Sequence, residues 1–164
     1  HEPGATLAVS IARPHSRGTI MATSADPYDR PLIKPNYLAE AADIQVALAG
    51  LRMARKIFTQ PAFAELSAGE ILPGPQAGTD EAMIEHIRAT GASIFHPVGT
   101  CKMGEDPLAV VDSRLRVRGM TGLRVIDASI MPAVTTGNTN APTIMIAEKG
   151  ASMIREDWKA KAAA

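Results

Sequence analysis

The chain has 164 residues, of which 46% are hydrophobic and 21% charged, so it suits one or at most two globular domains and is too apolar to be disordered. Its 17 basic and 17 acidic residues give a formal net charge of zero, which argues against nucleic-acid or membrane-surface binding driven by bulk charge. No apolar run approaches the roughly 20 residues that a membrane span needs. The single cysteine, Cys101, excludes an internal disulfide and favours a reducing, cytoplasmic location.

The N-terminal part is predicted to form two strands and a long loop. Hydrophobic and polar residues alternate along Leu7–Arg13, which is typical of a half-buried strand. Thr19–Thr23 has the composition of a second strand, and the turn-forming residues 14–18 between the two predict an antiparallel hairpin. Three prolines within residues 26–36 predict an extended surface loop.

Two helices are predicted in the middle of the chain. The longer covers residues 40–59 and ends before Pro61, and the shorter covers residues 81–89 with Thr79 or Asp80 as its N-cap. Prolines and glycines predict a loop over residues 69–78. The apolar residues that share one face of the longer helix are Ile44, Ala47, Leu48, Leu51, Ala54 and Phe58.

The last third is predicted to contain two strands and a final helix. Residues 114–118 alternate arginine with hydrophobic residues, and residues 123–127 form the next strand after a turn bounded by glycines. Asn140 is predicted to cap the final helix, with Pro142 in the first turn. Strands and helices in this order favour an α+β class over alternating βαβ units. The predicted apolar stripe of the final helix is Ile144, Ala147, Ala151, Ile154 and Trp158.

His96 is the residue to which the sequence assigns proton chemistry. It lies between Phe95 and Pro97, with Gly99 just beyond, so it belongs to a rigid turn and not to a helix. An imidazole takes up and releases protons near neutral pH, which suits a catalytic base. The alternative is a structural histidine hydrogen-bonded within a loop, and for His15 and His86 we prefer that interpretation.

A second candidate site lies where the final helix begins. Asn138 follows Gly137 just outside the predicted helix, so its amide is placed to hydrogen-bond a small polar ligand. The unpaired N–H groups and partial positive charge of a helix N-terminus suit an electron-rich group, such as the pyrimidine ring of a flavin during reduction. The alternative is an ordinary turn followed by an N-cap, which we prefer for Asn140.

Two further segments have competing interpretations. Asp127-Ala128-Ser129 follows a predicted strand, which is where open α/β sheets bind cofactors, but the same segment also suits an ordinary turn. Cys101 follows His96 by five residues, which would suit a thiol enzyme, although an unreactive buried cysteine fits better. The sequence contains no metal-ligand spacing, no Walker motif and no Gly-x-Ser-x-Gly.

Six segments, in this order and spacing, carry a resemblance to a known family. They are Ser16-Arg17-Gly18-Thr19, Asp26-Pro27, Pro35-Asn36-Tyr37, His96–Gly104, Val125–Ser129 and Gly137–Lys149. Together they resemble the C-terminal part of the glucose-methanol-choline (GMC) flavin oxidoreductases, and are most similar to the bacterial choline and alcohol dehydrogenase branch. The resemblance covers nearly the whole chain.

The resemblance implies a role for each matching residue. His96 would be the base that faces the flavin, and Asn138 would occupy the position at which the family carries a second histidine or an asparagine. Asp127, Ala128, Asn138 and Thr139 would lie against the FAD, and no metal is implied. The implied reaction oxidises a primary alcohol to an aldehyde by transferring hydride to N5 of the flavin while His96 handles the hydroxyl proton.

The resemblance also implies a fold and a domain arrangement. We expect an α+β fold, mainly antiparallel sheet with flanking helices, which forms the substrate-side part of a GMC oxidoreductase. Residues 1–110 would be the substrate-domain portion with the histidine loop. Residues 111–164 would supply a final strand and helix that complete the FAD-binding domain.

One departure from the family pattern concerns the cofactor. Nothing in the chain matches the dinucleotide-binding Gly-x-Gly-x-x-Gly that the family carries near its N-terminus. We therefore expect that the isolated chain neither holds FAD tightly nor turns over an alcohol without a missing N-terminal FAD-binding part. The alternative hypothesis is a freestanding, non-catalytic binding or assembly module on the same scaffold.

Overall fold

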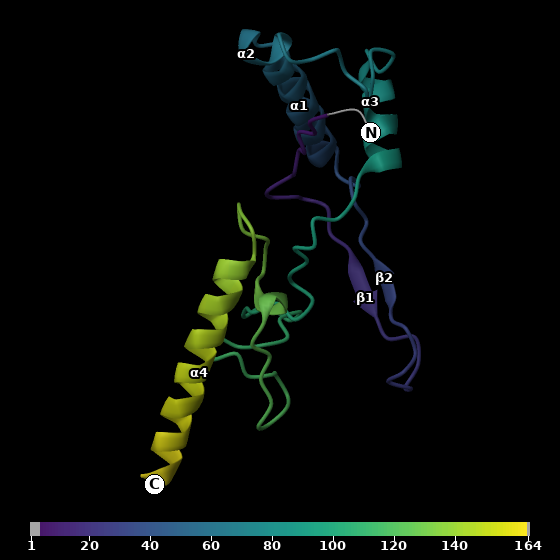
Figure 1. Cartoon of the computed structure of the whole chain (residues 1–164). Coiled ribbons are helices and arrows are strands. Elements are labelled where there is room, and N and C mark those ends of the chain that lie inside the picture. Colours follow the sequence, from purple (N-terminus) through teal and green to yellow (C-terminus); the bar gives the residue numbers. More distant parts are fainter. Residues whose placement is uncertain (1–3, 164) are drawn as a thin grey trace. The chain divides into compact units, whose positions relative to one another are not determined.

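The computed structural model describes residues 4–163, and its elements are labelled in Figure 1. The strands are β1 (Thr19–Met21) and β2 (Leu32–Lys34). The helices are α1 (Ala41–Phe58), α2 (Pro61–Ala64), α3 (Asp80–Thr90), the short 3-10 helix η1 (Ala128–Ile130) and α4 (Asn140–Ala162). Contacts divide the chain into two compact units, one with the residues up to Gly18 and Lys34–Ile94, the other with Thr19–Ile33 and the residues from Phe95 onward.

The expected α+β class is confirmed, but the sheet is smaller than predicted. It consists of β1 and β2, which pair as two antiparallel strands. The loop predicted over residues 26–36 therefore contains a strand, and β1 pairs with that strand instead of with Leu7–Arg13. The strand predicted at Leu7–Arg13 is wrong, because this stretch packs on α1, where the Val9 side chain lies against Gly50.

The helices of the first unit pack through the predicted apolar face of α1. Leu48 is fully buried and contacts Ala77 and Met83, and partly buried residues of α1 and α3 surround them. Thr79 accepts a hydrogen bond from the backbone N–H of Ala82, so the predicted N-cap of α3 is confirmed. Sequence analysis missed α2, a single turn that begins at Pro61.

A buried carboxylate fixes the first of the resemblance segments to α1. Asp43 is 1% exposed and accepts hydrogen bonds from the backbone N–H groups of His15 (2.8 Å) and Ser16 (2.7 Å) and from the Ser16 hydroxyl. Burial raises the pKa of the Asp43 carboxyl, but these hydrogen bonds outweigh it and hold the pKa below its usual value. Ser16 therefore has a structural role.

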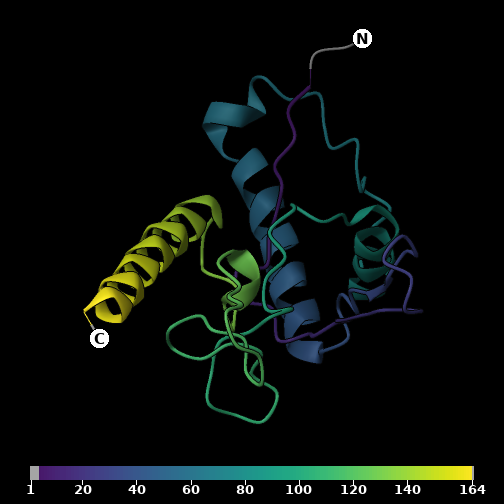
Figure 2. The same ribbon diagram turned by 90° about the horizontal axis from the view of Figure 1, so that it is seen from below.

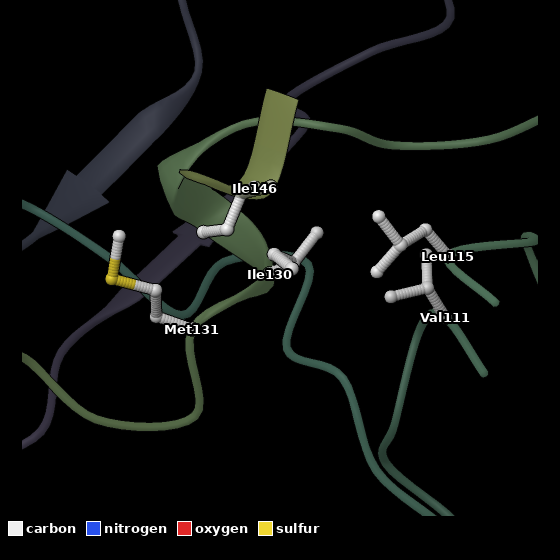
Figure 3. Close-up of a cluster of buried hydrophobic side chains, with 5 residues drawn as sticks. All are labelled: Val111, Leu115, Ile130, Met131 and Ile146. Carbon is white, nitrogen blue, oxygen red and sulfur yellow. The ribbon is translucent and has the colours of Figure 1, made fainter. Parts of the chain in front are cut away.

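The core of the second unit is a cluster of five buried side chains from three segments (Figure 3). Ile130 and Met131 belong to or follow η1, and Ile146 comes from α4, which lies beside η1 in Figures 1 and 2. Val111 and Leu115 complete the cluster. This core joins α4 to the loops that precede it.

The strands predicted at residues 114–118 and 123–127 are wrong. These segments make only isolated bridges, Val111 with Val117 and Arg116 with Arg124. The Asp112 carboxylate accepts hydrogen bonds from the backbone N–H groups of Arg114 (2.8 Å) and Arg116 (2.9 Å), which turns the chain where a strand would run straight. The alternation of arginine and hydrophobic residues thus belongs to a folded loop.

The final helix is confirmed, but two of its details differ from the prediction. Thr139 is the N-cap, and Asn140 is the first helical residue. The buried positions are Ile146 and Gly150, whereas Ile144 and Trp158 of the predicted stripe are 55% and 72% exposed. Within residues 4–163, no helix is both long and apolar enough to cross a membrane.

Candidate functional site

The loop that carries His96 is tied by its backbone to the segment around η1. Cys101 donates its N–H to the Ser129 carbonyl (3.0 Å), and Met103 donates to the Ile130 carbonyl (2.7 Å). Gly99 has a φ of +89°, and a Cβ built there would lie 3.3 Å from the Met131 carbonyl oxygen. Glycine at this position lets the loop turn close to η1, so the histidine is presented from a fixed backbone.

The backbone immediately before His96 is also unusual. Phe95 has a φ of +61°, in the left-handed region that residues with a side chain rarely adopt. His96 itself is half-buried. Strained residues persist only where their surroundings hold them, and they gather at functional sites.

The side chain of His96 is held by Thr139, the residue at the N-cap position of α4. Oγ1 of Thr139 lies 3.0 Å from Nδ1 of His96, and Thr139 is 8% exposed. The Thr139 carbonyl accepts from the Thr143 N–H (3.0 Å) and the Thr143 hydroxyl (2.6 Å). Two residues that lie 43 positions apart in the sequence thereby meet at the start of α4.

Several polar groups without a hydrogen-bond partner in the described chain lie at this site, on the His96 loop and at the start of α4. Among residues 4–163, Nε2 of His96 has no hydrogen-bond partner, and neither does the exposed amide of Asn138. Asn140 and Ala141, at the start of α4, likewise have backbone N–H groups with no acceptor in the described chain. A ring nitrogen, an amide and a helix N-terminus are thus free to bind a ligand.

Comparison with known proteins decides the family. The GMC oxidoreductase sequence profile matches residues 14–147 of the chain. The chain belongs to the GMC oxidoreductase family. The resemblance that the motifs predicted is therefore confirmed.

Individual GMC relatives agree with this assignment. The chain is 50% identical to an alcohol dehydrogenase (acceptor) of Pseudomonas putida over 92% of its length, and 48% identical to the oxygen-dependent choline dehydrogenase of Serratia proteamaculans over 94%. It covers 27% and 28% of those two relatives. An FAD-dependent oxidoreductase from Chaetomium thermophilum superposes with a TM-score of 0.84 and 32% identity, over 90% of this chain and 26% of that one.

Asp127 and Ala128 lie next to the histidine loop of this GMC chain. The Asp127 carboxylate accepts a hydrogen bond from the Ser129 N–H (2.7 Å) and so caps η1, which leaves a second carboxylate oxygen at an exposed residue. Ala128 packs against the core of the unit. The carbonyl of Ser129, the next residue in the chain, accepts the Cys101 N–H. Asp127 and Ala128 therefore lie beside the loop that carries His96. Their predicted contact with FAD stays a prediction.

The thiol-enzyme alternative gains no support from the geometry. Cys101 is a half-buried free thiol, and among the described residues no hydrogen bond joins it to His96. No cluster of three or more potential metal ligands occurs within residues 4–163.

Sequence reasoning missed the contact between Thr139 and His96 and the support from Thr143. The proximity of Thr139 to the cofactor stays a prediction, and the structure adds that its side chain hydrogen-bonds the imidazole. One signal was available. Pro142 occupies the third helical position of α4 and has no N–H, so the Thr139 hydroxyl lacks the donor that an N-cap threonine often binds there.

Proposed function

We propose that this chain is the substrate-side and C-terminal portion of an FAD-dependent alcohol dehydrogenase, in which His96 accepts the hydroxyl proton of a primary alcohol. The supporting observation is the bond of Thr139 to His96, because it fixes the imidazole beside Asn138 and the first turn of α4 and leaves Nε2 free. The names of the relatives, alcohol and choline dehydrogenases, support the substrate class.

His96 and Asn138 have different roles in the proposed reaction. Nε2 of His96 takes the hydroxyl proton as the oxygen becomes more negative, and the Asn138 amide donates a hydrogen bond to the same oxygen. When bound, the flavin supplies the acceptor for the hydride that leaves the substrate carbon. The backbone around Gly99 and η1 keeps the imidazole in one place, so little reorganisation accompanies the proton transfer.

The donors at the start of α4 fit the flavin. The free N–H groups of Asn140 and Ala141, together with the partial positive charge of the helix end, suit the electron-rich oxygens of a pyrimidine ring. Asn138, Thr139, Asp127 and Ala128 border the same end of α4 or the neighbouring loop, which supports their proposed place along FAD.

The rest of the cofactor site is proposed to come from an N-terminal FAD-binding part. The chain spans little more than a quarter of its curated relatives, and four large hydrophobic residues among residues 4–163, Tyr28, Leu66, Ile71 and Phe95, are at least 80% exposed. In this proposal residues 1–110 belong to the substrate domain, and residues 111–164 complete the FAD-binding domain. The predicted cytoplasmic location belongs to the same proposal.

The decisive experiment uses the complete enzyme with an artificial electron acceptor. His96→Gln is expected to lower kcat by about 10²–10⁴-fold, the usual contribution of a general base, while FAD absorbance per protein stays unchanged. Asn138→Ala is expected to lower kcat by a smaller factor. His86→Gln, at a half-buried histidine on α3, is the matched control and should leave turnover unchanged.

Two results would contradict the proposal. Turnover of His96→Gln within a few-fold of the wild type would mean that His96 is not the base. An isolated 164-residue chain that binds FAD tightly and oxidises an alcohol would remove the need for a second part. Choline, aliphatic and aromatic alcohols, compared by kcat/KM in the complete enzyme, then define the substrate.

A further inference from the structure

We propose that Thr139 is a positioning residue that accepts a hydrogen bond from Nδ1–H of His96 and so keeps Nε2 unprotonated and available as the base. This inference rests on the proposed function for its catalytic meaning, although the hydrogen bond itself can be tested without turnover. Threonine, a common helix cap, is here used to select one tautomer of a histidine.

The first argument comes from what the Thr139 side chain does not do. An N-cap threonine normally accepts a hydrogen bond from the second or third N–H of its helix. Thr139 makes no such bond, and its backbone is helical (φ −80°, ψ −3°) instead of extended. Pro142 removes one of the donors that it would need. The only hydrogen bond of its hydroxyl among the described residues is with His96.

The second argument comes from the contrast with another threonine cap in the same chain. Thr79 caps α3 with an extended backbone (φ −98°, ψ 162°), and its hydroxyl accepts from the Ala82 N–H at 3.3 Å. Ala82 is the third residue of α3, the position that Pro142 occupies in α4. The two caps therefore differ at one of the two positions whose N–H an N-cap hydroxyl can bind.

The third argument concerns the two protonation states that fit the 3.0 Å contact. If Thr139 donated to Nδ1, the neutral ring would carry its proton on Nε2 and could not act as a base there. If Nδ1–H donates to the Thr139 oxygen, Nε2 keeps its lone pair. The same hydrogen bond then survives when Nε2 takes up a proton, because Nδ1–H still donates, and the ring stays in place during the transfer.

The test measures the tautomer directly on the 164-residue chain labelled with ¹⁵N in its histidine rings. Long-range ¹H–¹⁵N spectra of neutral His96, assigned through His96→Gln, are expected to show a protonated Nδ1 and an unprotonated Nε2. Thr139→Val, which keeps the shape and removes the hydroxyl, should shift both nitrogen signals toward the average of exchanging tautomers. Thr139→Ser should restore the wild-type signals.

A histidine outside this site provides the internal control. His86 lies on α3, and its Nε2 is 3.4 Å from the Thr90 hydroxyl, which donates to the His86 carbonyl at 2.8 Å. Thr90→Val should leave the ring signals of His96 unchanged. Far-UV circular dichroism reports whether each variant keeps its helices, and the wild-type tautomer decides the question even if Thr139→Val fails to fold.

In the complete enzyme, Thr139→Val is expected to lower kcat by roughly 5-fold to 10-fold, the equivalent of one ordinary hydrogen bond, with Thr139→Ser close to the wild type. A wild-type His96 protonated mainly on Nε2, or ring signals unchanged in Thr139→Val, would overturn the role of Thr139. Whether His96 acts as a base at all is decided separately, by the kcat of His96→Gln in the complete enzyme. Failure of the inference and failure of the proposed function are thus separable.

Discussion

Helices α3 and α4 both have a threonine at the N-cap position, but the two helix N-termini are stabilised in different ways. Thr79 satisfies one of the free N–H groups of α3 with its own side chain. Thr139 leaves those of α4 open and turns its hydroxyl to His96. A capped helix start is a finished structural element, whereas an uncapped one next to an imidazole has groups left for a ligand. The difference separates a structural helix from one that forms part of a site.

An uncapped helix needs support from elsewhere in its unit, and α4 has two such supports. One is close packing, because Ile146 and Gly150 are buried and a Cβ built on Gly150 would lie 2.5 Å from Cγ2 of Ile126. The other is a group of ion pairs near its C-terminal end, in which Asp157 meets Arg114 (2.7 Å) and Arg124. Substitutions that disturb each of these supports, or remove the Thr79 cap, test the comparison.

The largest effect on stability is expected from Gly150→Ala. Alanine is the better helix former by about 1 kcal/mol, but its methyl group would overlap Ile126, and overpacking of this kind costs typically 1–3 kcal/mol. Chemical denaturation should therefore show a net loss of up to about 2 kcal/mol. Gly78→Ala is the control, because the nearest atom to its added Cβ is 3.9 Å away.

A double variant tests the reason for that loss. Ile126→Ala removes the side chain that the new methyl group would meet, so Gly150→Ala should cost less in that background than alone. If the two single losses were simply additive, close packing against Ile126 would not be what seats α4.

A smaller effect is expected from the two threonine caps. Thr79→Ala removes the hydrogen bond to the Ala82 N–H and should lower the free energy of unfolding by about 1 kcal/mol. Thr139→Ala removes no cap bond from α4, so amide exchange in the first turn should quicken in α3 with the former variant and stay nearly unchanged in α4 with the latter. Equal quickening in both helices would mean that the two threonines have the same role.

The same contrast shows how far the sequence could predict the fold. The three long helices were predictable because apolar spacing and start signals such as Thr79 act over a single turn. The strands predicted at residues 114–118 and 123–127 were not formed, since one side chain, Asp112, bends the backbone there. Along α4 the apolar residues did not predict the buried face, because the closest packing occurs at Gly150, which has no side chain.

The candidate site was predictable as a set of residues but not as a geometry. The motifs selected His96, Asn138 and Thr139, and the structure joins His96 to the residue that follows Asn138. The bond spans 43 positions, so no local pattern could reveal it. The one local indication was Pro142, whose missing N–H leaves the Thr139 hydroxyl available for another hydrogen-bond partner.

The smallest effect is expected at the C-terminal end of α4 and depends on pH. Burial raises the pKa of the Asp157 carboxyl, but hydrogen bonds and charges from Arg114 and Arg124 lower it more, so its folded pKa lies below the usual 3.8. A carboxyl with a lowered pKa stabilises the fold above its unfolded pKa and loses that contribution as the pH falls through the folded pKa. Amide exchange at this end of α4 should therefore quicken below about pH 4.

Asp157→Asn should abolish that acid-induced change and quicken exchange modestly at neutral pH, less so at high salt because the pairs are partly exposed. Glu156→Gln is the matched neighbour, since Glu156 forms one ion pair among the described residues, with Arg114 at 3.2 Å, and is more exposed, so its effect should be smaller still. Protection in Asp157→Asn that still fell with acid would assign the pH dependence to other carboxylates, such as Asp112, whose folded pKa is also lowered. The packing at Gly150 would then be the main support that lets α4 do without a cap.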